Sequence, residues 1–202
     1  MIKRRVLLSL AVLGSALGLA ACERFSAEQP HFNGVDLTGA KYARELQLPD
    51  IDGRSRSLTD FKGKVVVVFF GYTQCPDVCP TTMAELAQVK KALGADGDRL
   101  QGVFVTVDPE RDTPELLKAY LGSFDPSFVA LRGSEAQIKQ AAQEFKVYYA
   151  KMPGKTPESY TMDHTAASFV FDPQGRVRVF ERYGIGAEAL SQDIRLLLSE
   201  KS

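Results

Sequence analysis

The stretch GKVVVVFFGYTQCPDVCP, residues 63–80, decides the fold class of this chain. Residues 65–70 are apolar throughout and mostly β-branched, which is typical of a strand buried on both faces of a sheet. A loop with two cysteines, Cys75 and Cys79, follows directly and leads into a region of helical periodicity. The chain therefore places two thiols at the carboxyl end of a buried strand, where open α/β sheets bind ligands.

Strands and helices alternate outward from this stretch. Residues 103–107 form a second continuous apolar run and predict another buried strand, and the C-terminal part predicts a hairpin around the turn 172–175 and a last helix. This order is that of a thioredoxin-like fold with an inserted strand and helix, an α/β domain in which helices flank a central mixed sheet in three layers. The predicted helices have apolar faces at Met83, Leu86, Ala87 and Leu93, at Leu116, Leu117, Tyr120 and Leu121, at Ile138, Ala141, Ala142 and Phe145, and at Leu190, Ile194, Leu197 and Leu198.

Composition limits the classes of function. Of the 202 residues, 45% are hydrophobic and 25% charged, which fits one globular domain with an appendage. The 25 basic and 25 acidic side chains balance. Binding to nucleic acid through overall charge requires an excess of Lys and Arg, so no nucleic-acid partner is expected. Three cysteines are too few for a disulfide scaffold.

The first residues predict export. A basic head at residues 3–5 precedes an uncharged run, residues 6–21, and Cys22 follows. A basic head and a short apolar run form a secretory signal, and this run is shorter than the roughly 20 residues of a membrane-spanning helix. The ending Leu19-Ala20-Ala21-Cys22 resembles the bacterial lipobox, whose cysteine becomes the lipidated first residue of the mature protein. A plain signal peptide with a chance cysteine and an uncleaved anchor are the alternatives.

This interpretation predicts three segments. Residues 1–21 are the signal peptide, residues 22–36 a lipid-anchored tether, and residues 37–202 the folded domain. The protein is then expected on the periplasmic face of a bacterial inner membrane. Removing residues 1–21 takes away three basic side chains and no acidic ones, which leaves 22 basic against 25 acidic, a net charge of −3.

The two cysteines of the loop are expected to be chemically active. Pro80 suits the first position of a helix and a residue before proline avoids the helical region, so we expect Cys79 to be the N-cap. Its sulfur then faces free backbone N–H groups and the positive end of the helix dipole, which favour the thiolate. The three residues between the cysteines allow a disulfide or a shared metal ion. A purely structural disulfide is the alternative, although so short a loop gains only about 2 kcal/mol.

The globular part contains one histidine, His164, which follows Cys79 by 85 residues and precedes the predicted strand 166–171. If that strand runs antiparallel to the central strand, its start lies at the same sheet edge as the cysteines. Two thiolates and one imidazole suit Cu(I), which is soft and accepts few ligands, better than zinc, which usually takes four. Cu(II) can use the same ligands with added water. A packed or surface histidine is the alternative.

Three further residues are candidates near this site. Met83 and Met162 offer thioether sulfur, although Met83 falls on a helical core face and fits packing better. Asp108 follows the strand 103–107 and so reaches the same edge, where its carboxyl can orient the His164 ring or a partner. An Asp-Pro pair is also a common turn, which is the structural alternative.

Taken together, these motifs resemble the Sco/SenC family of copper chaperones of respiratory oxidase assembly. The resemblance implies a thioredoxin-like fold and copper bound by Cys75, Cys79 and His164. It extends over about residues 34–198 and rests on residues 63–73 running into Cys75-Pro76-Asp77-Val78-Cys79-Pro80, on Val107-Asp108-Pro109 with Arg111-Asp112, and on Asp163-His164-Thr165.

The resemblance also implies a function. Copper would be delivered to the dinuclear copper A site on subunit II of cytochrome c oxidase, or the thiols of that site would be kept reduced. Expected partners are that subunit or another copper-requiring respiratory protein, other periplasmic copper carriers, thiol reductants, and the membrane through the lipid on Cys22. A reversible Cys75–Cys79 disulfide would gate the cycle, because the disulfide form cannot bind copper.

A thiol-disulfide oxidoreductase is the alternative function, with Cys75 and Cys79 as its redox-active pair. Dedicated oxidoreductases of this fold use Cys-x2-Cys rather than Cys-x3-Cys. In addition, no proline lies between Pro157 and Pro173, where thioredoxins place a cis-proline. A peroxide-reducing thiol enzyme shares the fold but does not need the histidine. We therefore expect a metal-binding and transfer protein rather than an enzyme.

Overall fold

The structure, a computed structural model, describes residues 31–156 and 159–200. One compact unit begins at Phe32, and of the residues before it only His31 is described. The predicted signal peptide 1–21 and the lipidation site Cys22 therefore lie outside the described residues. None of the described helices is both long and apolar enough to cross a membrane.

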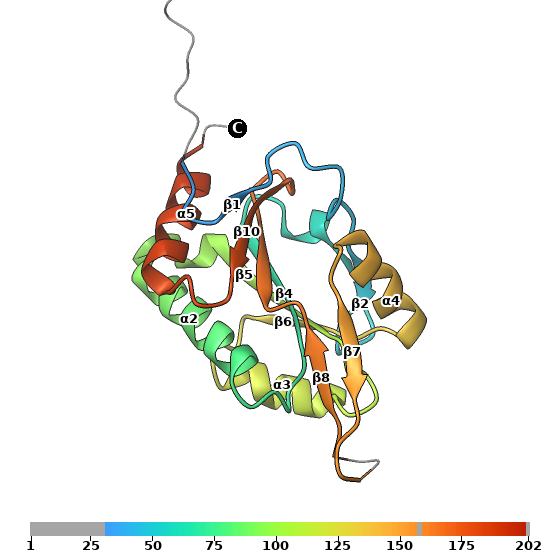
Figure 1. The fold of residues 1–202 in the computed structure, drawn as a ribbon. Helices are drawn as coiled ribbons and strands as arrows, with labels where there is room; N and C mark the ends of the chain where they lie inside the picture. Colours follow the sequence, from blue (N-terminus) through green and yellow to red (C-terminus); the bar gives the residue numbers. More distant parts are fainter. Residues whose placement is uncertain (1–30, 157–158, 201–202) are drawn as a thin grey trace, which may run out of the picture. The chain divides into compact units, whose positions relative to one another are not determined.

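The order of elements along the chain is that of an α/β domain (Figure 1). The strands are β1 (Val35–Asp36), β2 (Gln47–Pro49), β3 (Ser55–Ser57), β4 (Val65–Gly71), β5 (Leu100–Thr106), β6 (Val129–Leu131), β7 (Tyr149–Met152), β8 (Thr161–His164), β9 (Ala167–Phe171) and β10 (Val177–Arg182). The helices are α2 (Val78–Ala92), α3 (Pro114–Gly122), α4 (Glu135–Glu144) and α5 (Ala187–Ser199), with the 3-10 helices η1 (Leu58–Phe61) and η2 (Gly94–Arg99).

A six-stranded sheet forms the centre of the unit, in the order β1-β10-β9-β4-β5-β6. The strands β4, β5 and β6 are parallel, whereas β9 runs antiparallel to β4 and β10 antiparallel to β9. Every residue of β4 and β5 is buried, as expected of strands that are covered on both faces. The mixed sheet confirms the predicted α/β class.

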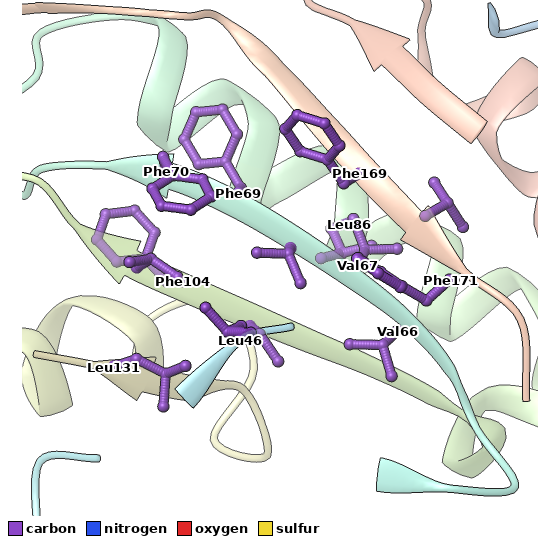
Figure 2. Packing of buried hydrophobic residues seen from close by; sticks show 14 of the residues in the cluster. Leu46, Val66, Val67, Phe69, Phe70, Leu86, Phe104, Leu131, Phe169 and Phe171 are labelled. Carbon is purple, nitrogen blue, oxygen red and sulfur yellow. The ribbon is translucent and has the colours of Figure 1, made fainter. Parts of the chain in front are cut away.

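Helices cover both faces of this sheet. Neighbouring residues of β4 point to opposite faces, so each face receives part of the apolar side chains of this strand. On one face the rings of Phe69 and Phe104 contact each other, and α2 and α3 pack there. On the other face Phe70 packs against Phe145 at the end of α4, and Phe145 also contacts Phe169 of β9. Figure 2 shows Phe69, Phe70, Phe104 and Phe169 along neighbouring strands. The predicted three layers are confirmed.

One edge of the sheet collects the segments that carry the candidate site. Gly71 at the end of β4 pairs with Thr106 at the end of β5. Because β9 is antiparallel to β4, its first residue, Ala167, starts at this same edge, as predicted. The hairpin of β7 and β8 was not predicted, and it forms a separate two-stranded sheet in which Tyr149 pairs with His164.

The folded unit begins earlier than the predicted start at residue 37. Phe32 is buried, and β1 pairs with β10. Asn33 donates from its backbone and side-chain N–H groups, and Gly34 from its backbone, to the buried carboxylate of Asp193. The segment is polar and has no periodicity, so its sequence predicts a tether where the structure has the first strand.

Candidate metal centre

The two cysteines lie where β4 passes into α2, but their positions on the helix differ from the prediction. The helix begins at Val78 with Asp77 as N-cap, so Cys79 is its second residue and Pro80 its third. The prediction of Cys79 as N-cap was therefore wrong. Proline is tolerated throughout the first helical turn, because the N–H groups there have no partner within the helix.

This shift changes which sulfur receives the N–H groups of the helix start. The backbone N–H of Cys79 points to the Sγ of Cys75 at 3.5 Å. A hydrogen bond from the Cys79 thiol, helped by the N–H groups of Asp77 and Cys79, lowers the pKa of Cys75 to about 4. The same hydrogen bond and burial raise the pKa of Cys79 above its ordinary value. The thiolate expected on Cys79 thus belongs to Cys75.

His164 meets the cysteines from the end of β8. Its Nε2 lies 3.4 Å from the Sγ of Cys79, and its Nδ1 lies 3.2 Å from the backbone oxygen of Thr165. A carbonyl oxygen can only accept, so Nδ1 carries a proton, and in the neutral ring Nε2 presents its lone pair to the sulfurs. The imidazole is held edge-on to two aromatic rings, with centroids 5.8 Å from Phe69 and 6.0 Å from Tyr72.

The three side chains form one cluster of donor atoms. The Sγ atoms of Cys75 and Cys79 and a ring nitrogen of His164 all lie within 4.8 Å of one another. Cys79 is fully buried, whereas Cys75 and His164 are half-buried, and both cysteines are free thiols. Two sulfurs and one neutral imidazole at this spacing fit a soft metal ion with a low coordination number. The structure thus brings together the three residues singled out in the sequence.

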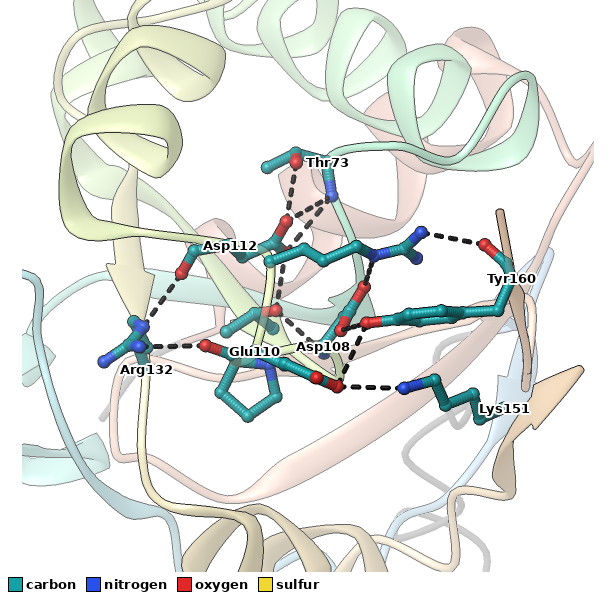
Figure 3. Close-up of polar contacts among 10 residues, drawn as sticks. Thr73, Asp108, Glu110, Asp112, Arg132, Lys151 and Tyr160 are labelled. Atoms are coloured by element: carbon teal, nitrogen blue, oxygen red, sulfur yellow. Dashed lines mark hydrogen bonds and ion pairs between the residues drawn. The ribbon is translucent and has the colours of Figure 1, made fainter. Parts of the chain in front are cut away.

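A buried carboxylate, Asp112, anchors the cysteine loop. Its oxygens accept from the backbone N–H of Thr73 at 3.2 Å, from the Thr73 hydroxyl at 2.6 Å and from the Thr106 hydroxyl at 2.6 Å (Figure 3). Burial raises the pKa of Asp112. The loop before Cys75 is therefore tied to the end of β5. Asp112 was not among the candidate residues, because an aspartate in a polar turn carries no local sign of such a contact.

Asp108 lies near the centre but has partners other than the imidazole. One carboxylate oxygen accepts from Nε of Arg111 at 2.5 Å, and the other accepts from the hydroxyl of Tyr160 at 2.7 Å. The group at Nδ1 of His164 is instead the carbonyl of Thr165. Arg111 and Tyr160 were not among the candidates, since their contact joins residues 49 positions apart.

The two candidate methionines belong to the hydrophobic core. Met83 is 1% exposed and Met162 is 9% exposed, and both pack in the main cluster of buried residues. Met83 lies on the inner face of α2, where its helical periodicity placed it.

Comparison with known proteins gives a consistent set of relatives. The family model SCO1/SenC matches residues 35–199. An SCO2-like protein of Rickettsia felis is 34% identical over 178 residues, which cover 87% of this chain and 86% of the relative. The human mitochondrial protein SCO2 homolog is 37% identical over 153 residues, covering 75% of this chain and 58% of the relative.

Solved structures agree with these relatives. Bradyrhizobium japonicum ScoI, solved with copper bound, is 41% identical, with a TM-score of 0.69 over 76% of this chain and 98% of that one. Apo Sco1 of Thermus thermophilus is 37% identical, with a TM-score of 0.74 over 85% of this chain and 99% of that one. Both similarities cover most of the compact unit, so the predicted thioredoxin-like fold is confirmed.

Proposed function

Because the chain belongs to the SCO1/SenC family, we propose that it binds copper through Cys75, Cys79 and His164 and serves in the assembly of cytochrome c oxidase. The observation that carries this proposal is the clustering of three soft donor atoms within 4.8 Å at one sheet edge. Structures of Sco proteins from Bradyrhizobium japonicum and yeast, both with copper bound, support the choice of metal.

The donor set favours Cu(I). Thiolates hold this ion strongly, and three ligands satisfy it. Cys75 is already a thiolate above its lowered pKa, whereas the Cys79 thiol must lose its proton, so copper binding releases a proton and becomes tighter as the pH rises. The hydrogen bond of Nδ1 of His164 to Thr165 fixes the ring with Nε2 toward the sulfurs. Cu(II) can occupy the same three ligands with added water.

The exposure of the ligands suggests how copper leaves. Cys79 is fully buried, whereas Cys75 and His164 are half-buried and can be reached from solvent. An incoming thiolate of a partner therefore approaches on the side of Cys75 and His164. Neutral imidazole holds Cu(I) less strongly than thiolate, so His164 is the ligand that is displaced first. We assign the copper A site on subunit II of cytochrome c oxidase as the acceptor.

The redox state of the two cysteines gates this cycle. Oxidation to a Cys75–Cys79 disulfide removes two electrons and both sulfur ligands at once, so the oxidised protein cannot take up copper. A dithiol reductant of the periplasm returns the two electrons and restores the site. The dithiol form described here is the copper-accepting state.

The proposed place of action is the periplasmic face of the inner membrane, with the chain held by lipid on Cys22. The basic head, the uncharged run 6–21 and the lipobox-like ending support this location. Cys22→Ser should release the protein from the membrane fraction without changing copper binding by the folded unit. If the variant stays in the membrane fraction and its intact mass still includes residues 1–21, the segment is an uncleaved anchor.

Copper binding is tested by competition with a chromophoric Cu(I) chelator, using the reduced protein under anaerobic conditions. The wild type should bind one Cu(I), and Cys75→Ala, Cys79→Ala and His164→Ala should each weaken binding. His31→Ala is the matched control, because His31 is the chain's other histidine. Binding that His164→Ala leaves unchanged, or that His31→Ala weakens equally, would refute the ligand set.

Service to the oxidase is tested in cells. Deleting the gene should lower the copper A absorption of the assembled oxidase, and the wild-type chain should restore it. The His164→Ala chain should fail to do so at equal protein level. If this variant restores the oxidase fully, the protein acts on the oxidase through its thiols alone.

Thiol-disulfide exchange is the second candidate function, and the contrast between the two thiols favours it. The half-buried Cys75, with its lowered pKa, suits attack on a partner disulfide, and the buried Cys79 suits resolution of the mixed disulfide. The partner gains two electrons and the Cys75–Cys79 pair becomes a disulfide. Rapid reduction of insulin disulfides, undiminished in His164→Ala, would favour this function, and both activities can use one site.

A further inference from the structure

The metal ligand His164 lies on an element that the main sheet does not hold. The hairpin of β7 and β8 is a separate two-stranded sheet, and the pairing of Tyr149 with His164 is internal to it. The backbone N–H of Thr165 donates to the backbone oxygen of Tyr148, and the backbone N–H of Tyr148 donates to the Thr165 hydroxyl; these two bonds also join only the ends of the hairpin. His164 is brought to the cysteine edge by β9, which starts three residues later, and its final distance to the cysteines also depends on side chains that tie this hairpin to the rest of the domain.

Arg111 supplies such a tie to the start of β8. Its Nη1 donates to the backbone oxygen of Tyr160 at 2.8 Å, and its guanidinium lies 3.5 Å from the centre of the Tyr160 ring. The ammonium of Lys151 lies 3.6 Å from the same ring centre. Two cations cannot share one face of a ring at these distances, so Tyr160 is clamped between them. Figure 3 shows Tyr160 and Lys151 in this cluster.

The same guanidinium also reaches the start of the cysteine loop. It lies 5.8 Å from the ring centre of Tyr72, the first residue after β4, and the Tyr72 ring stands edge-on to the imidazole of His164. Arg111 therefore lies between the segment that carries the cysteines and the segment that carries the histidine. We propose that Arg111 is a positioning residue, which sets the separation of His164 from the cysteine pair; this inference rests on the proposed copper function.

The chemistry of the contacts requires arginine at this position. Nε donates to Asp108 at 2.5 Å while Nη1 donates to Tyr160, and the planar face stacks on the ring at the same time. The ammonium of a lysine cannot make these three contacts together. The side chain of Arg111 is 15% exposed and that of Asp108 is 4% exposed, so solvent screens their ion pair only weakly.

One atom of Arg111 is left without a partner. Its Nη2 is buried and has no acceptor among the described residues. A buried donor without an acceptor is unfavourable and rare, so each such group calls for an explanation. Despite this unpaired donor, the guanidinium lies between the rings of Tyr72 and Tyr160, and both residues adjoin segments of the metal centre.

The test is a double-mutant cycle on Cu(I) affinity. Arg111→Lys in the wild-type background should weaken Cu(I) binding about tenfold or more, as expected when a group that orients a ligand is lost. In the His164→Ala background the same substitution should change the affinity by less than about twofold, because the residue it positions is gone. Equal losses in both backgrounds, or no loss in the wild type, would overturn the proposal.

Arg178→Lys is the matched control. Arg178 is a buried arginine paired with Asp172 and Glu200 and lies over the ring of Phe32, at the other end of β9 and β10 from the metal centre. Its substitution should lower the stability to unfolding as Arg111→Lys does, but leave the Cu(I) affinity unchanged. An equal loss of affinity in both variants would mean that Arg111 has only a structural role.

A copper-free measurement separates this proposal from the copper site itself. In the reduced apo protein, nuclear Overhauser contacts should connect the ring protons of His164 with those of Phe69 and Tyr72. Arg111→Lys should weaken these contacts, and Arg178→Lys should preserve them. If His164→Ala leaves Cu(I) affinity unchanged, the ligand set is wrong, and these ring contacts still decide whether Arg111 positions His164. Unchanged ring contacts in Arg111→Lys would overturn the inference alone.

Discussion

The Nε2 of His164 lies 3.4 Å from the Sγ of Cys79, although 85 residues separate the two in the chain. The contact arises because β9, which follows His164, runs antiparallel to β4, which precedes the cysteines. One buried strand pair thus brings the three candidate ligands to the same edge of the sheet. The two thiols differ in pKa, and the start of α2 contributes to this difference because the N–H of Cys79 points to the sulfur of Cys75.

Cys75 should be the reactive thiol at low pH. Its pKa is lowered to about 4, so it is ionised at pH 6, whereas the raised pKa of the buried Cys79 keeps that thiol protonated. Iodoacetamide at pH 6 should therefore label Cys75 only, as read by peptide mass spectrometry. In Cys79→Ala the main hydrogen bond to Cys75 is lost, and labelling at pH 6 should slow. Equal labelling of both cysteines in the wild type, or a rate that rises only near the ordinary thiol pKa of about 8.5, would contradict this assignment.

Asp112→Asn should loosen the cysteine loop. The amide of asparagine cannot accept from Thr73 and Thr106 with both of its polar atoms, so one buried donor loses its partner, at a cost of about 1–3 kcal/mol. Cu(I) affinity should fall as well, because the loop before Cys75 is no longer fixed. Chemical unfolding and chelator competition measure the two effects.

Asp50→Asn is the control for this change. Asp50 is 7% exposed and accepts from the backbone of Asp52 and Arg54 and from Arg56, in a turn between β2 and β3. This variant should lose stability and keep its Cu(I) affinity. If Asp112→Asn loses only stability, the anchor does not shape the metal site.

Glu181 should make the fold less stable as the pH rises. Burial, followed by the nearby carboxylate of Asp193, raises its pKa to about 8. A group with a raised pKa in the folded state contributes stability below its unfolded pKa of about 4.3, and this stability is lost as the pH rises through 8. Because Cys75, whose pKa is lowered to about 4, stabilises the fold over the same pH range, the effect is read as a difference between proteins. From pH 5 to pH 9 the wild type should lose a few kcal/mol, in order of magnitude, of unfolding free energy relative to Glu181→Gln. The exposed Glu188→Gln should follow the wild type; parallel profiles for all three proteins would show that Glu181 is not the group responsible.

Gly34→Ala should destabilise the N-terminal strand. A Cβ at this position would lie 2.5 Å from Oε2 of Glu181 and 2.5 Å from Cγ1 of the buried Val179, so the segment must move. Overpacking of this kind costs about 1–3 kcal/mol. At Gly122, the last residue of α3, a Cβ meets nothing within 4 Å, so Gly122→Ala should be neutral or slightly stabilising. Thermal unfolding that ranks the two variants in the opposite order would contradict the packing described for residues 33–36.

Most strands, helices and turns of the fold were predictable because their sequence signals are local. The apolar run of β4, the capping box of Ser134 and Gln137 and the turn before β10 act over a few residues, and each lies where its pattern predicts. His164 was found because one topological assumption, an antiparallel β9, places it at the cysteine edge. Chemistry and topology together were therefore enough to single out three candidate ligands that the structure brings close together.

The remaining features depend on contacts between distant residues. The hairpin β7–β8 has no strong alternation of apolar residues, since Tyr149–Met152 are half-buried or exposed. Arg111, Tyr160 and Asp112 are ordinary polar residues until the fold brings them beside the cysteine loop. The N-cap at Asp77 differs from the predicted Cys79 because the first helical turn accepts proline at more than one position.

X-ray absorption at the copper edge tests the central claim most directly. The reduced protein loaded with one Cu(I) should show two sulfur scatterers and one nitrogen scatterer with the multiple-scattering pattern of imidazole. His164→Ala should remove the imidazole pattern and keep both sulfurs, and Cys75→Ala should remove one sulfur, while His31→Ala should reproduce the wild-type spectrum. A wild-type spectrum without imidazole, or one that His164→Ala leaves unchanged, would contradict copper binding by Cys75, Cys79 and His164.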